Sequence, residues 1–190
     1  IKKFHEILTR VLGGDYWKAA LLTEDLSTKE REEMIVAGYR KLLASTNYLV
    51  YTGACPVQES RDSRTKYYMI FASRHPDAIE LINDRMIGAV EKHMNERELR
   101  GTLFADMTWQ AWRNPDEVKG IALRHVEQYP GMTRKGLWDL FIQQHFLRFT
   151  TSEFKKALNE LIKDRAIHSP TQRATYRLNE SCILYPGSGD

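Results

Sequence analysis

The first residues whose types could support catalysis lie at Arg74-His75-Pro76, where an apolar, strand-like run gives way to a helical pattern. Junctions of this kind often carry the active sites of α/β enzymes. His75 with Asp77 or Asp84 could act as a general base and the carboxylate that orients it. No nucleophile accompanies them, and a His before Pro at such a junction more often caps or packs. We therefore predict no catalytic residue in this chain.

Metal-binding patterns are also absent from the sequence. The six histidines are dispersed, with no His-Glu-x-x-His motif and no pair at i, i+4. Cys55 and Cys182 stand alone, without a Cys-x-x-Cys motif, and isolated cysteines favour reduced thiols in a cytoplasmic protein. We predict no metal ligand and expect a cytoplasmic location.

Composition sets the general class. The 190 residues are 42% apolar and 11% aromatic, which suffices for a packed core. No apolar run approaches the roughly 20 residues that span a bilayer, so we expect no membrane association. The chain opens on Ile1 rather than Met, which suggests a fragment of a longer protein.

Positive charge is concentrated in the C-terminal part. Residues 119–177 hold eleven basic and five acidic side chains, a surplus of six, whereas the whole chain carries +3. A polar linker before this segment marks a domain boundary. We therefore predict a first domain at 1–94, a linker at 95–117 and a second domain at 118–190.

The second domain has the sequence pattern of three helices followed by a hairpin. Helical segments are predicted at 118–128, 134–144 and 152–165, with Thr133 and Thr150, Thr151 or Ser152 as N-caps. Two short strands around a Ser-Pro-Thr-Gln turn are predicted at 166–178. This order is typical of a winged helix-turn-helix domain.

Spacing on the third helix separates two faces. Phe154, Leu158, Leu161 and Arg165 should point inward, with a polar and cationic row on the opposite side. In a DNA major groove, lysines would neutralise phosphates and Asn could read an adenine edge. The alternatives are an ordinary solvated face or a protein-interaction module. The predicted nucleic-acid-binding residues are Arg134, Lys135, Ser152, Lys155, Lys156, Asn159, Lys163, Arg173 and Arg177.

The first domain reads as helices followed by a thin sheet. Helices are predicted at 1–12, 16–22, 28–44 and 77–94, and strands at 48–51 and 67–72, with Ile79, Ile82, Met86 and Val90 on one face of the last helix. Two strands do not close a domain alone. The predicted fold class is α+β and mainly α: a C-terminal remnant of a Rossmann-like α/β sheet, then a winged helix.

Three segments of this first domain carry a resemblance. They are GGDYWKAAL at 13–21, EREEMIVAGYRKLL at 30–43 and TKYYMIFASRHPDAIELINDRM at 65–86. Through them, residues 1–94 resemble the end of the α/β domain of the three-Cys-motif partner (TcmP) proteins, which are methyltransferase-like. Asp77-Ala78 depart from the family, whose members often place Gly shortly after the His-Pro.

The resemblance implies a cofactor and a partner. It implies an S-adenosylmethionine-binding half upstream of Ile1, because this chain lacks the Gly-rich strand-to-helix turn that such a cofactor needs. We therefore expect no cofactor here, and S-adenosylmethionine only in the full-length protein. It also implies a protein partner with a three-Cys motif. Two functions stay open: a nucleic-acid-binding module, or a fragment of a methyltransferase whose winged helix binds substrate or a protein.

Overall fold

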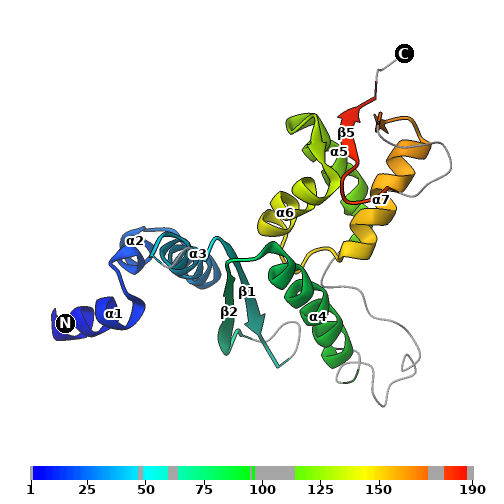
Figure 1. Cartoon of the computed structure of the whole chain (residues 1–190). Coiled ribbons are helices and arrows are strands. Elements are labelled where there is room, and N and C mark those ends of the chain that lie inside the picture. The colour runs from blue at the N-terminus through cyan, green and yellow to red at the C-terminus, as the bar shows by residue number, and fades with distance from the viewer. Residues whose placement is uncertain are drawn as a thin grey trace. The chain divides into compact units, whose positions relative to one another are not determined.

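The protein is an α+β chain, mainly helical, with two small antiparallel sheets (Figure 1). The computed structural model describes residues 2–46, 49–59, 64–94, 96, 114–170 and 178–187. These residues form two compact units. The N-terminal unit contains residues 2–46, 49–58 and 64–79, and the C-terminal unit contains residues 59, 80–94, 96, 114–170 and 178–187. Among the described helices, none combines the length and apolar character required to cross a membrane.

The N-terminal unit contains three helices and a hairpin. Its elements are α1 (Lys2–Leu12), α2 (Tyr16–Leu22), α3 (Thr28–Thr46), β1 (Tyr51–Val57) and β2 (Tyr67–Ser73). The two strands pair antiparallel, from Tyr51 opposite Ser73 to Val57 opposite Tyr67. The helices confirm the predicted pattern. The strand predicted at 48–51 was wrong in its bounds, because residues 49 and 50 precede the strand and pairing with β2 continues to Val57; residue 48 lies outside the described part.

Polar contacts connect the elements of the N-terminal unit. Ser27 and Glu30 form reciprocal side-chain bonds that begin α3, a capping box. Arg31 Nη1 donates to the carbonyl oxygens of Ala20 (2.7 Å) and Leu21 (3.1 Å), which caps the end of α2. Arg31 therefore connects the first turn of α3 to the end of α2.

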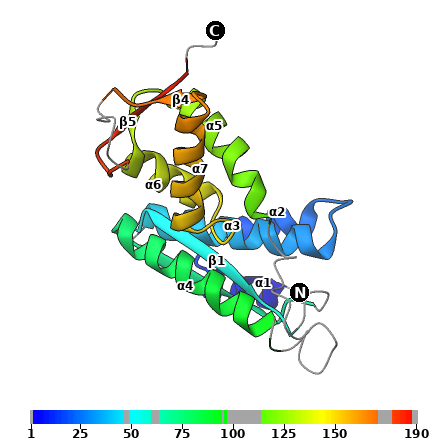
Figure 2. The same cartoon turned by 90° about the vertical axis from the view of Figure 1, so that its right-hand side faces the viewer.

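The C-terminal unit contains the larger core. Its elements are α4 (Pro76–Met94) from Glu80 onward, η2 (Pro115–Glu117), α5 (Val118–Gln128), β3 (Met132–Thr133), α6 (Arg134–Gln144), α7 (Thr151–Lys163), β4 (Ile167–His168) and β5 (Ile183–Pro186). Figure 2 shows α5 and α7 side by side, with β4 and β5 at one end of the pair. The three helices predicted in this part are confirmed, two of them with the same bounds.

The small sheet of this unit contains the first strand of the predicted hairpin and a strand beyond it. Its strand order is β3-β5-β4, and all pairs are antiparallel. The strand that pairs with β4 is Ile183–Pro186, which lies beyond the predicted hairpin. Residues 171–177 of that predicted hairpin lie outside the described part. A two-residue strand before α6 completes the sheet. Pairing between segments some 50 residues apart gives no local sequence signal.

The division between the two compact units falls inside α4, after Ile79. The reason is visible in the buried face of that helix. Asn83 and Ile87 are almost fully buried, and Asn83 hydrogen-bonds the segment between α6 and α7. Of the residues predicted to share one face of this helix, Ile79 is buried, and Ile82, Met86 and Val90 are half-buried.

Candidate nucleic-acid interface

The candidate interface is built on α7, whose ends are fixed by local chemistry. Thr150 Oγ1 accepts from Glu153 N (3.2 Å), and a Glu153 carboxylate oxygen accepts from Thr150 N (2.7 Å). This capping box satisfies two N–H groups that the first turn leaves without helical partners. The helix ends at Lys163, and Arg165 then takes a positive φ of 60°.

One face of α7 packs into the core. Phe154, Leu158 and Leu161 are buried, as the sequence predicted, together with Ala157. The prediction for Arg165 was wrong: its side chain is exposed, because the helix has already ended two residues earlier. Burial of this stripe fixes which side of α7 faces solvent.

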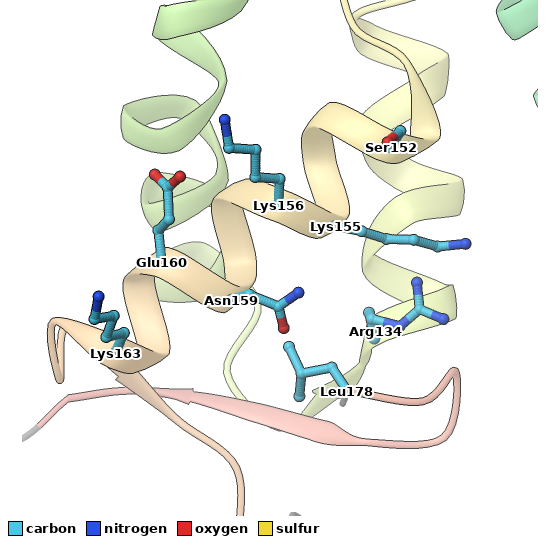
Figure 3. A pocket seen from close by; sticks show the side chains of 8 residues that line it. All are labelled: Arg134, Ser152, Lys155, Lys156, Asn159, Glu160, Lys163 and Leu178. Atoms are coloured by element: carbon cyan, nitrogen blue, oxygen red, sulfur yellow. The ribbon is translucent and has the colours of Figure 1, made fainter. Parts of the chain in front are cut away.

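The opposite face of α7 lines an open groove of about 470 Å³. Figure 3 shows Asn159 in the middle of the groove, with its amide toward Leu178. Lys156 and Lys163 extend on one side of it and Lys155 on the other (Figure 3). The lining residues are Arg134, Ser152, Lys155, Lys156, Asn159, Glu160, Lys163 and Leu178. Six of the nine predicted binding residues therefore lie together.

The three lysines of this groove keep their charge available. Lys155, Lys156 and Lys163 are exposed, and none has an acidic partner among the described residues. Three uncompensated ammonium groups along one helix face create a local positive potential.

Among the described residues of the lining, Glu160 is the one that is acidic, and it faces another cation. Its carboxylate lies 4.0 Å from the ammonium of Lys119, which also binds Asp164. The bond to Asp164 raises the pKa of Lys119. Glu160 is thus partly neutralised from the α5 side, and the groove stays positive.

Two predicted cations are engaged inside the protein. Arg134 is 5% exposed; its Nε donates to the Asn179 carbonyl oxygen (2.9 Å), and its Nη2 lies 3.8 Å from a Glu180 carboxylate oxygen. Arg134 therefore helps to form the wall of the groove. Lys135 does not line it, since its ammonium binds Asp139 (2.8 Å) and Glu80 (3.3 Å). Arg173 and Arg177 lie outside the described residues.

Other chemistry has little support in the described part of the chain. No group of three or more His, Cys, Asp or Glu side chains there could hold a metal ion. His75 is exposed at the start of α4, and Asp84 is engaged by the backbone N–H of Thr151 (3.0 Å). Cys55 and Cys182 are buried and unpaired, and burial raises the pKa of the Cys55 thiol.

The sequence analysis missed the residues that support α7 from α4. They are Glu80, Asn83 and Asp84, which bond the turn between α6 and α7 and the start of α7. One signal was present. Asn83 lies midway between Ile79 and Ile87 at intervals of four residues, so it is a polar residue on an apolar helical stripe.

No protein-family model, curated protein or solved structure matches the chain. The resemblance to the three-Cys-motif partner proteins therefore stays a prediction from the sequence.

Proposed function

We propose that the C-terminal unit is a winged helix-turn-helix module that binds nucleic acid, DNA in particular, through the outward face of α7. The observation that carries this proposal is the groove in which three unpaired lysines surround Asn159. In such a module, α6 would be the supporting helix and the small sheet would be the wing.

The groove chemistry suits a DNA duplex. The major groove is about 12 Å wide and admits an α-helix, so a face of short polar and cationic side chains can reach both backbone and bases. The lysines would bind phosphates, which fixes orientation. Asn159 would donate to and accept from an adenine edge, the pairing that an Asn side chain forms best.

The composition of the groove lining also favours a duplex over a single strand. Proteins that bind single strands usually stack bases on aromatic side chains. None of the described lining residues is aromatic. Affinity would then come from phosphate contacts and major-groove readout.

A charge reversal tests the proposal. The double variant Lys156→Glu/Lys163→Glu should abolish binding of a DNA duplex in a fluorescence-anisotropy titration, because repulsion replaces two phosphate contacts. The matched control is Lys29→Glu/Lys41→Glu, two exposed lysines of α3 with the same change in net charge. Unchanged binding by the first variant, or equal loss in both, would contradict the proposal.

The sequence resemblance supports a second candidate, part of an S-adenosylmethionine-dependent methyltransferase whose winged helix binds substrate or a three-Cys-motif partner protein. The exposed apolar side chains of Phe4, Val11 and Leu22 favour it, since a larger α/β domain would cover such surfaces. Calorimetry on the full-length protein should then detect S-adenosylmethionine binding, and the lysine reversals should matter little. Absence of cofactor binding would count against this candidate.

A further inference from the structure

The turn between α6 and α7 leads into the first residue of α7, and its backbone has an unusual conformation. Leu147 lies in this turn with a φ of 64°, a conformation that an L side chain rarely adopts. Leu147 is also 7% exposed. Such a residue keeps its conformation only where the surroundings determine it.

Asn83 of α4 holds the backbone of this turn in place by hydrogen bonds. Its Oδ1 accepts from the backbone N–H of Leu147 (2.7 Å), and its Nδ2 donates to the carbonyl oxygen of Phe149 (2.9 Å). Asn83 is 0% exposed, so its amide forms these bonds away from water. One side chain thus holds two backbone groups on either side of Arg148. Asn offers both a donor and an acceptor at the required places, and an apolar residue would leave both backbone groups unbonded.

Two neighbours of Asn83 in α4 bind the start of α7 itself. Asp84 Oδ1 accepts from the backbone N–H of Thr151 (3.0 Å), and Glu80 Oε1 accepts from the Thr151 hydroxyl (3.1 Å). Negative charge is favourable at this end of a helix, where the backbone N–H groups lack helical partners. α4 therefore binds both the turn and the first residue of the helix that follows.

We propose that Asn83, assisted by Asp84, is a positioning residue for nucleic-acid binding: it sets the angle of α7 without touching the ligand. This inference rests on the proposed function. The 13 residues of α7 extend from the point that α4 holds. A helix of that length is about 18 Å long, so a tilt of about 10° at its start moves Lys163 by about 3 Å, the length of one hydrogen bond.

The experiment uses the whole chain and a DNA duplex of about 20 base pairs, two turns of the helix. Asn83→Ala should weaken binding about tenfold, equivalent to about 1.4 kcal/mol. The dependence of affinity on salt should persist, because the lysines remain. Asp84→Ala should weaken binding less. Ile87→Val, one turn further along the same buried face, is the control, since it loses apolar contact and keeps every hydrogen bond.

A second readout separates positioning from general loss of stability. Amide hydrogen exchange under native conditions should speed up at Leu147 in Asn83→Ala and at Thr151 in Asp84→Ala, with little change in the middle of α5. All affinities are measured at temperatures where each variant is folded by circular dichroism.

The outcomes distinguish this inference from the function beneath it. If the wild type binds and the Lys156→Glu/Lys163→Glu variant does not, but Asn83→Ala binds within twofold of the wild type, the positioning role is wrong and the proposed function stands. Equal weakening by Asn83→Ala and Ile87→Val also overturns the positioning role. If the wild type does not bind the duplex, both proposals fall together.

Discussion

The two units of this chain divide its apolar residues very unequally. Of the buried apolar side chains in the described residues, four lie in the N-terminal unit and eighteen in the C-terminal unit. The exposed large apolar side chains are distributed in the opposite way, with eight in the N-terminal unit and two in the C-terminal unit. Burial of apolar surface is the main favourable term in folding. We therefore expect the C-terminal unit to fold independently and the N-terminal unit not to do so.

The same contrast applies to sheets and to candidate function. The hairpin β1–β2 is a two-stranded sheet, which is marginal in water by itself. The three-stranded sheet of the C-terminal unit extends from a core of three helices, and α7 presents its charged row from that core. A binding surface needs a rigid support, and among the described residues the C-terminal unit has the larger buried core.

Separating the units should give the largest effect. Residues 76–190 alone should unfold cooperatively in urea, because the core of the C-terminal unit lies within them. Residues 1–79 alone should lack a cooperative transition and aggregate through their exposed apolar side chains. Circular dichroism with denaturant measures both. A cooperative transition in the shorter piece would contradict the comparison.

Truncation of a central aromatic should come next. Phe141 is 0% exposed and its ring lies 4.6 Å from the ring of Phe154, centroid to centroid. Phe141→Ala should lower the free energy of unfolding by about 3–5 kcal/mol, through lost burial and a cavity. Phe4→Ala in the N-terminal unit, where Phe4 is 61% exposed, should change it by less than about 0.5 kcal/mol. Similar losses would remove the distinction between the units.

Acid should selectively destabilise the C-terminal unit. Burial, and then the nearby His125, Arg148 and Arg124, lower the pKa of His145 from 6.5 to about 4. The unfolded chain thus takes up this proton at higher pH than the folded one, so stability present above pH 6.5 is lost as the pH falls toward 4. After allowance for partial solvent exposure, the loss should be about 1–2 kcal/mol.

The control for this pH dependence is His145→Gln, which cannot titrate. Urea unfolding of residues 76–190 between pH 7 and pH 4 should show a smaller loss of stability in the variant than in the wild type. An identical pH dependence in both proteins would show that His145 does not contribute.

Helix caps should give the smallest effect, and both units offer one of the same kind. Thr150→Ala removes the capping box of α7 and should lower the free energy of unfolding of the C-terminal unit by about 1 kcal/mol. Ser27→Ala removes the equivalent bonds of α3, but its effect should appear as faster amide exchange in the first turn of that helix. A change in global unfolding of equal size for Ser27→Ala would show that the N-terminal unit also contributes to the cooperative transition.

The contrast also explains what could be predicted from the sequence. The bounds of α5 and α6 and the buried face of α7 follow from local periodicity and N-caps, so Phe154, Leu158 and Leu161 were identified correctly. The position of β5 depends on pairing with β3, some 50 residues away, and local patterns carry no such information.

The same distinction between local patterns and tertiary contacts applies to the candidate site. The exposed lysines of α7 follow from helical geometry alone. The engagement of Arg134 by the backbone of Asn179 and of Lys135 by Glu80 depends on tertiary contacts, so sequence analysis could not separate these cations from the free ones. The role of Asn83 depends on a turn 64 residues further along the chain.

The central claim, that the outward face of α7 binds nucleic acid through its lysines, is tested most directly by the salt dependence of duplex binding. A plot of log affinity against log salt should be linear, with each lysine–phosphate contact contributing about −0.9 to its slope. Lys156→Gln should make the slope shallower by about that amount, while Lys29→Gln leaves it unchanged. A slope near zero for the wild type, or the same slope in Lys156→Gln, would contradict the account.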